Sequence, residues 1–273
     1  MRCFYINLDA SIQRKSSIEN NFAKYRKGHW SLDRISAVDV EYVNSHRIPG
    51  SIRDAEKACF LSHKKTILQN LDTDENIFIL EDDAMFGRRT CETIENILNG
   101  IGELEWDIIF TDLVIPNIDA MANLLILRQK LVAQNRVRLL NPKNLIYAGA
   151  TAYIINKKSK RKIYDFLESV KNLDIPYDLF LRRLIRKSNI NGYVIFPFAT
   201  SLSEFSESSN IQTAATRDEN LIWDMYRRMV WLEGNIAQHQ PILDDINQKL
   251  GAEEKAFGIL WAALASKHFR INH

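Results

Sequence analysis

Short apolar runs alternate with helical segments through residues 4–198 of the chain. The most distinct run, at residues 77–80, reads Ile-Phe-Ile-Leu, which is typical of a strand buried on both faces of a sheet. The alternation predicts an α/β fold with a mostly parallel sheet and flanking helices. Residues 115–145 carry no readable pattern. The predicted strands are 4–8, 30–38, 77–80, 106–113, 145–156 and 193–198, and the predicted helices are 12–25, 55–71, 90–101, 157–171 and 177–187.

The pattern changes after residue 205. Residues 204–217 are rich in Ser, Thr and Asn and predict a loop, whereas residues 218–273 show only helical patterns. We therefore predict two domains, an α/β domain at 1–215 and a helical C-terminal appendage at 216–273. The loop residues Ser208, Ser209 and Asn210 are either a lid that closes over a ligand or an ordinary linker.

The bulk composition excludes several classes of protein. Hydrophobic residues make up 46% of the 273 residues and charged residues 26%, which is ordinary for a globular protein. The 36 basic and 34 acidic residues leave a net charge of +2, so nothing indicates a nucleic-acid partner. The three cysteines, Cys3, Cys59 and Cys91, form neither a disulfide framework nor a paired zinc motif, which favours a reducing compartment.

The two ends of the chain bear on its location. The N-terminal apolar run is too short for a signal peptide. The apolar run at 257–265 is nine residues long, shorter than the roughly 18–20 residues that span a bilayer. It is either an interfacial membrane helix, with Lys267, His268 and Arg270 after it, or a helix packed on its own domain or in a homodimer; we favour packing. We expect a cytoplasmic protein, either free or peripheral on the inner face of the membrane.

Three consecutive carboxylates follow the run at 77–80 directly: Glu81, Asp82 and Asp83. Ligands of open α/β sheets bind beyond the carboxyl ends of the strands. A divalent cation relieves the repulsion between such carboxylates, and oxygen ligands suit Mn²⁺ or Mg²⁺. A cation bound by these carboxylates can coordinate a diphosphate. The alternative is that these acids solvate the strand end or cap the next helix.

Six sequence blocks resemble, in order, those of glycosyltransferase family 25, which includes bacterial lipooligosaccharide galactosyltransferases and collagen galactosyltransferases. The resemblance covers about residues 3–211. The blocks are FYINLD (4–9), RISAVD (34–39), ACFLSH (58–63), ILEDDA (79–84), AGATAYII (148–155) and IPYD (175–178).

This resemblance implies a GT-A-like fold and an inverting transfer. It implies a UDP-sugar donor, frequently UDP-galactose, and a divalent metal, Mn²⁺ or Mg²⁺, that bridges the diphosphate. The implied acceptor is a glycan of lipooligosaccharide or another surface polysaccharide, free or lipid-linked. Asp83 is expected to bind the metal, Glu81 to help through the ribose, a water or the metal, and Asp82 to point towards the donor sugar.

Other donor-site residues come from the first and third blocks. Asn7, Leu8 and Asp9 end the first strand, where Asn7 and Asp9 can hydrogen-bond the base or ribose and Arg14 can meet phosphate. The alternatives are an Asx turn at Asp9 and a solvated Arg14. In the family, the block that contains Ser62 and His63 lies near the donor. The alternative is that His63 is a structural histidine on a helix, with its ring nitrogens hydrogen-bonded to a neighbouring group.

An inverting transfer needs a base near the acceptor hydroxyl. Asp178, at the start of a predicted helix, is the first candidate and Asp112 is the second; the alternative for Asp178 is helix capping. Gly149, Thr151 and Tyr153 are expected to line the acceptor site, although Tyr153 fits the core equally well.

Two other functional classes stay open from the sequence. A metal-dependent phosphohydrolase can use the same carboxylates, and a non-catalytic nucleotide- or glycan-binding module can keep them without transferring a sugar. The sequence contains no P-loop, no Gly-x-Gly-x-x-Gly run and no His-Glu-x-x-His pair.

Overall fold

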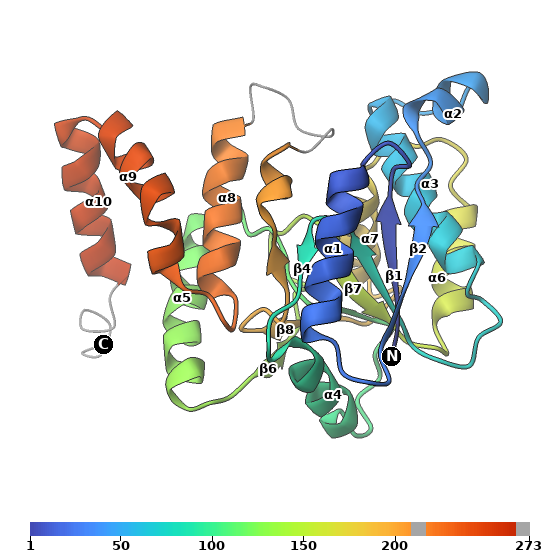
Figure 1. The fold of residues 1–273 in the computed structure, drawn as a ribbon, viewed down its shortest axis with the longest axis horizontal. Coiled ribbons are helices and arrows are strands. Elements are labelled where there is room, and N and C mark those ends of the chain that lie inside the picture. The colour runs from blue at the N-terminus through green and yellow to red at the C-terminus, as the bar shows by residue number, and fades with distance from the viewer. Residues whose placement is uncertain (209–216, 266–273) are drawn as a thin grey trace.

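The computed structural model describes residues 1–208 and 217–265 of the chain (Figure 1). A seven-stranded sheet lies at its centre, in the order β2-β1-β3-β7-β5-β8-β6. Strand β1 pairs in parallel with β2 and β3, and β5 pairs in parallel with β8. Only β7 and β6 run antiparallel to their neighbours in this sheet. The strands are β1 (Arg2–Asn7), β2 (Ser31–Ser36), β3 (Ile77–Glu81), β5 (Ile108–Phe110), β6 (Arg138–Leu140), β7 (Ala152–Ile155) and β8 (Gly192–Phe196).

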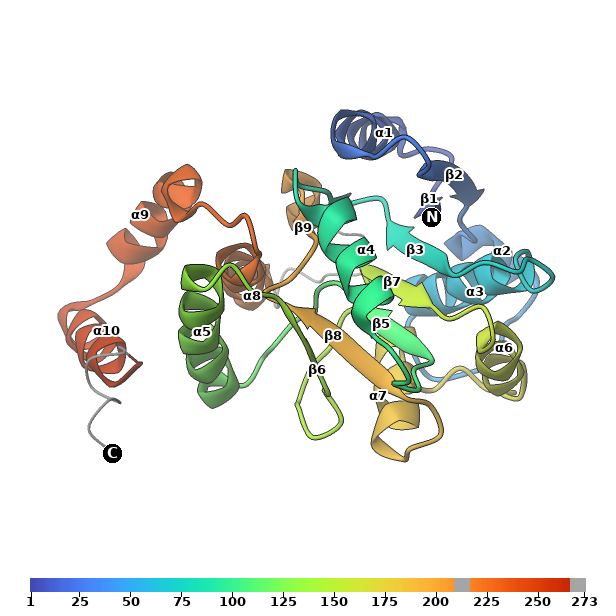
Figure 2. The same cartoon turned by 90° about the horizontal axis from the view of Figure 1, so that it is seen from below.

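Helices cover both faces of the sheet, as predicted (Figure 2). Successive side chains of a strand point to opposite faces: Phe4 and Ile6 of β1 join one core, and Cys3 and Tyr5 join the other. The first core is closed by α3, α6 and α7, and the second by α1 and α4. The helices between residues 12 and 186 are α1 (Ile12–Tyr25), α2 (Val40–Ser45), α3 (Asp54–Leu68), α4 (Thr90–Gly100), α5 (Ile118–Ala133), α6 (Lys160–Glu168) and α7 (Tyr177–Arg186).

Two elements fill the stretch that had no readable pattern, helix α5 and strand β6. Several predicted strands are also shorter in the structure. The strand predicted at 145–156 is reduced to β7, because Gly149 has a φ of +83°, which an extended strand does not allow. Residues 152–155 keep the pairing with β3 and β5.

A small antiparallel ribbon adjoins the acidic residues. Strand β4 (Ala84–Met85) pairs with β9 (Ser201–Leu202), and the backbone N–H of Ser203 donates to the Asp83 carbonyl at 2.8 Å. The ribbon therefore ties the turn after β3 to the segment that follows β8.

The C-terminal helices differ in how they pack. In α8 (Arg217–Val230), Tyr226 and Val230 belong to the first core. Helices α9 (Gln240–Lys249) and α10 (Ala252–Ala265) lie beside α5 and α8, at the edge of the molecule (Figure 1). Helix α8 is thus part of the main body, and the predicted division into domains at residue 215 stays a prediction.

Helix α10 leaves Phe257, Ile259 and Leu260 between 64% and 71% exposed. Within the described part of the chain, none of the helices combines the length and the apolar character needed to cross a membrane. Ser209, Asn210, Lys267, His268 and Arg270 lie outside the described residues, and the side chain of Ser208 is not described either.

Candidate active site

The carboxyl ends of the parallel strands meet at one edge of the sheet. Asn7 ends β1, Ser36 ends β2 and Glu81 ends β3, and these three strands are adjacent and parallel. A cavity of about 520 Å³ opens at this edge. Eight of the predicted donor-site and metal-site residues line it: Asn7, Leu8, Arg14, Ser62, His63, Glu81, Asp82 and Asp83.

A second cavity of about 320 Å³ adjoins the first at Glu81. Its lining includes Gly149, Thr151 and Asp178, which were predicted for the acceptor side. Glu81 and Cys59 line both cavities, so the two spaces meet at these side chains. The structure therefore places most of the predicted donor and acceptor residues in neighbouring cavities, whereas Asp9 and Tyr153 line neither of the two.

Arg14 of α1 holds two of the three acids. Its Nε donates to Asp82 Oδ1 at 2.7 Å and its Nη2 to Asp83 Oδ2 at 3.0 Å. Its Nη1 donates to the Phe205 carbonyl at 2.6 Å. Because the Arg14 side chain is only 18% exposed, these ion pairs are largely shielded from water. Arg14 was predicted to meet phosphate, and here it orients carboxylates.

Asn7 links the acids to a second arginine. Its Nδ2 donates to Asp82 Oδ2 at 2.7 Å, and its Oδ1 accepts from Arg34 Nε at 2.9 Å. Arg34 Nη2 also donates to Asp9 Oδ1 at 2.5 Å. Asp9 points outward, with a side chain 77% exposed. Arg34 was not predicted as a site residue, although it opens the second family block and could have been found there.

Asp83 has a carboxylate oxygen that lacks a hydrogen-bond donor in the described part of the chain. It is buried, and its Oδ1 has no hydrogen-bond partner among the described residues. Burial, followed by the charge of Glu81, raises the pKa of Asp83 to about 7. A buried carboxylate oxygen without a donor, beside a second carboxylate, is the arrangement that a hard divalent cation relieves. The residues present therefore fit a metal at this point.

His63 connects Glu81 to the core. Its Nε2 lies 3.4 Å from Glu81 Oε1, and its Nδ1 lies 2.8 Å from the Tyr153 hydroxyl. The Tyr153 hydroxyl also lies 2.7 Å from that of Tyr177, on which the His63 ring stacks at 4.2 Å. His63 is thus satisfied by neighbours, and it lines the donor cavity as well. Tyr153 is fully buried in the core.

Ser62 holds the backbone beside the donor cavity. Its hydroxyl donates to the Ala58 carbonyl at 2.7 Å and accepts from the Val38 N–H at 2.8 Å. The second of these bonds fixes the strand-to-helix connection that forms one wall of the cavity.

The two candidate bases lie in different surroundings. Asp178, on the first turn of α7, borders the second cavity, and its Oδ2 accepts the Gly149 N–H at 2.6 Å. Burial raises the pKa of its carboxyl above the ordinary value. Asp112 is 1% exposed, pairs with Arg227 and lines neither of these two cavities. Asp178 thus borders the cavity that Gly149 and Thr151 line, whereas Asp112 is joined to Thr151 through the buried Arg227.

Arg227 was not foreseen as a residue near the site. From α8 its Nη2 donates to Asp112 Oδ2 and, at 2.9 Å, to the Thr151 hydroxyl. It also pairs with Asp224 at 3.4 Å. No local sequence signal identifies it, because Asp112 lies 115 residues away along the chain.

Comparison with known proteins identifies a protein family that this chain matches. The family model described as glycosyltransferase family 25 (LPS biosynthesis protein) matches residues 1–181, which is more than half of the chain. A search of curated proteins found no match. The likenesses to solved structures are distant. Glycosyltransferase GlyE of Streptococcus pneumoniae TIGR4 matches in its apo form with 11% identity and a TM-score of 0.37, over 70% of this chain and 44% of that one.

A second GlyE structure matches with 13% identity and a TM-score of 0.38, over 82% of this chain and 50% of that one. The apo form of mouse xyloside xylosyltransferase 1 matches with 12% identity and a TM-score of 0.34, over 70% of this chain and 63% of that one. The chain thus spans about half the length of GlyE. The family assignment rests on the family model and on the blocks that the sequence shares with it. This chain belongs to glycosyltransferase family 25.

Proposed function

We propose that this chain transfers a hexose from a UDP-sugar to a glycan acceptor, with inversion of configuration at the anomeric carbon. Galactose is the first candidate for the hexose. One observation carries the proposal: the ends of β1 and β3 and the helix α1 direct Asn7, Arg14 and the acidic triplet into one cavity of about 520 Å³. This cavity has the size of a small-molecule site. It lies at the carboxyl edge of the sheet, where nucleotides bind in α/β proteins.

Asp83 and Glu81 are the proposed ligands of Mn²⁺ or Mg²⁺. The support is the buried Asp83 Oδ1 that lacks a donor, together with the Glu81 carboxylate next to it. When bound, the ion supplies positive charge that steadies the departing diphosphate. Arg14 keeps Asp82 and Asp83 in place, because it binds one oxygen of each.

The nucleotide itself is proposed to lie against the β1 side of the cavity. Asn7, Leu8 and the wall fixed by Ser62 line that side. Asp9 follows Leu8 directly, is held by Arg34 and is largely exposed, but does not itself line the cavity. We propose that Asn7 and Asp9 position the base or ribose, and that His63 holds the Glu81 carboxylate at the junction of the two cavities.

Asp178 is the proposed base. It borders the second cavity with Gly149 and Thr151, and Glu81 separates this group from Asn7 and Leu8 in that it lines both cavities. Its raised pKa makes the ionised carboxylate a better proton acceptor than an ordinary aspartate. In this proposal an acceptor hydroxyl in the second cavity gives its proton to Asp178 while its oxygen attacks the sugar from the face opposite the leaving UDP. The bond to the diphosphate then breaks with inversion.

Three finer points stay predictions. The acceptor is a glycan of lipooligosaccharide or a related surface polysaccharide, and a lipid attached to it is not required by the site. The exposed apolar side chains of α10 suit contact with a membrane surface or with a second copy of the chain. A cytoplasmic location follows the expectation from the sequence.

The function is tested by assaying the purified chain with UDP-galactose and UDP-glucose, Mn²⁺ and truncated lipooligosaccharide acceptors. The proposal expects acceptor-dependent transfer that chelation abolishes, with Asp83→Asn lowering the rate by more than about 100-fold, beyond the effect of outer-shell changes. The control is Asp74→Asn, a carboxylate whose side chain is 93% exposed.

Other results would replace the proposal. Donor hydrolysis that the acceptor does not stimulate indicates a phosphohydrolase. UDP binding without transfer to any acceptor indicates a non-catalytic binding module. Transfer that survives chelation at full rate contradicts the metal role of Asp83.

A further inference from the structure

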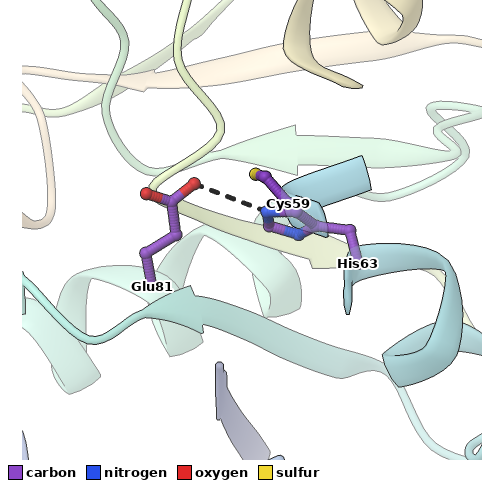
Figure 3. Close-up of side chains that lie close together, drawn as sticks. All are labelled: Cys59, His63 and Glu81. Carbon is purple, nitrogen blue, oxygen red and sulfur yellow. Dashed lines mark hydrogen bonds and ion pairs between the residues drawn. The ribbon is translucent and has the colours of Figure 1, made fainter. Parts of the chain in front are cut away.

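A thiol, an imidazole and a carboxylate converge at the junction of the two cavities (Figure 3). Cys59 and His63 lie four residues apart on α3, and so on one face of the helix. Glu81 reaches them from the end of β3. One ligand atom from each of the three lies within 4.8 Å of the other two. Within residues 1–208 and 217–265, this is the one such group of three potential metal ligands.

We propose that Cys59, His63 and Glu81 form a binding site for a thiophilic divalent cation such as Zn²⁺. Sulfur, nitrogen and carboxylate oxygen are the ligand atoms that Zn²⁺ takes in proteins, whereas Mn²⁺ and Mg²⁺ prefer oxygen alone. The site is therefore chemically different from the oxygen site proposed at Asp83. With three protein ligands, the fourth tetrahedral position is left to water or substrate.

The distances are close to what a tetrahedral site needs. Metal–ligand bonds of about 2.0–2.3 Å place neighbouring ligand atoms about 3.3–3.8 Å apart. His63 Nε2 and Glu81 Oε1 already lie 3.4 Å apart. The ligand atoms lie within 4.8 Å of one another, so the Cys59 sulfur must approach by up to roughly 1.5 Å when the cation binds. Its thiol proton leaves to solvent when the cation binds.

His63 is oriented for this role by its other nitrogen. The Nδ1 atom lies 2.8 Å from the Tyr153 hydroxyl, which lies 2.7 Å from that of Tyr177. When Nδ1–H donates to Tyr153, Nε2 carries the lone pair and faces Glu81 and Cys59. Such a hydrogen bond on the far side of the ring is the usual support of a metal-ligating histidine. The ring also stacks on Tyr177 with an interplanar angle of 4°, which fixes its plane.

The site has a consequence for catalysis that rests on the proposed function. Glu81 lines both cavities and is a proposed ligand of the catalytic Mn²⁺. A cation held between Cys59 and His63 withdraws Glu81 from that role. Zn²⁺ is therefore expected to inhibit transfer at concentrations where Mn²⁺ supports it, and excess Mn²⁺ should relieve the inhibition, because both ions need Glu81.

Cobalt serves as the probe, because Co²⁺ bound to a thiolate gives a charge-transfer absorption in the near ultraviolet. The full-length protein is titrated with Co²⁺, and then with Zn²⁺ as competitor. The expected result is a thiolate–cobalt band that saturates at one ion per chain and disappears when Zn²⁺ is added. Cys59→Ala and His63→Gln are expected to abolish the band and to weaken Co²⁺ binding by about tenfold or more.

Two controls separate this site from the rest of the molecule. Cys91→Ala removes a buried thiol on α4 and should leave the band unchanged. Asp83→Asn should also keep the band, even where it abolishes transfer, so the two proposals fail independently. In the wild-type protein, Zn²⁺ should slow alkylation of Cys59 by a maleimide, which tests the site without a substitution.

The proposal is overturned when the wild-type protein gives no thiolate–cobalt band, when a folded Cys59→Ala variant keeps it, or when Zn²⁺ leaves the alkylation of Cys59 unchanged.

Discussion

Arg14 Nη2 donates to Asp83 Oδ2 at 3.0 Å, which joins the first helix to the acidic turn that follows the third strand. The same guanidinium binds Asp82 through Nε. One cation therefore sets the positions of two adjacent carboxylates, and it leaves Asp83 Oδ1 as the oxygen without a donor. The candidate metal site depends on this arrangement.

Replacing Arg14 by Gln is expected to destabilise the fold and to abolish activity. The variant leaves Asp82 and Asp83 largely buried without their counter-charge, and breaking a buried ion pair costs about 3–5 kcal/mol. Urea denaturation measures the loss. The matched control is Arg2→Gln, because the Arg2–Asp33 pair is about half exposed and is expected to matter by less than about 1 kcal/mol. Equal losses in the two variants would contradict the structural role of Arg14.

Replacing Asp178 by Asn is expected to lower kcat by about 10²–10⁴-fold, because the acceptor hydroxyl loses its proton acceptor. Binding of UDP should be unchanged, since Asp178 borders the second cavity and not the donor cavity. Steady-state kinetics together with thermal shift by UDP separate the two effects. A variant that keeps wild-type kcat shows that the base lies elsewhere.

Removing Arg227 from the core is expected to cost about 3–5 kcal/mol, because Asp112 is left buried without its partner. Urea denaturation of Arg227→Met measures this cost.

The position of Arg227 in the chain also makes the predicted domain boundary at residue 215 testable. A fragment of residues 1–215 lacks Arg227 and the core residues Tyr226 and Val230, and is expected not to fold stably. A fragment of residues 1–250 keeps all three. A stable 1–215 fragment would show that α8 is dispensable.

The ion pair at Asp107 predicts a stability that depends on pH. Burial alone would raise the pKa of Asp107, but bonds from Ser159 at 2.6 Å, the Asn191 N–H at 2.6 Å and Lys162 at 3.0 Å lower it below its ordinary value. A carboxyl whose folded-state pKa is depressed stabilises the fold above its unfolded pKa of about 4, and this contribution disappears as the pH falls through the folded-state pKa.

The matching experiment compares wild type with Asp107→Asn by urea denaturation at neutral and at acidic pH. The difference in unfolding free energy should be about 1.5–3 kcal/mol at neutral pH and should shrink in acid. A difference that is independent of pH would mean that the charge of Asp107 does not contribute.

The elements nearest the candidate site were readable from the sequence. Helix 12–25 has the predicted ends, and the run at 77–80 forms a central strand that carries the acids to the carboxyl edge. Both follow from local patterns, a helical period after Ser11 and a short apolar run. The family blocks then placed the donor-side residues, all of which except the outward-pointing Asp9 meet in one cavity.

Other features depend on contacts that no local pattern encodes. Residues 124–127 of α5 are four consecutive apolar residues, which carry no helical period. Strand β6 is three residues long, too short to be recognised. The bond from Arg227 to Asp112 joins residues 115 positions apart. The metal, the donor and the roles of Asp178 and His63 remain predictions, because they concern bound molecules.

The metal role of Asp83 is tested by a calorimetric titration of UDP into the protein, with Mn²⁺ and after chelation, for wild type and Asp83→Asn. A metal held by Asp83 should tighten UDP binding to wild type by at least about tenfold, and Asp83→Asn should remove this gain while the fold persists. Equal UDP affinity with and without Mn²⁺ in the wild-type protein would contradict a metal-assisted diphosphate site at the end of β3.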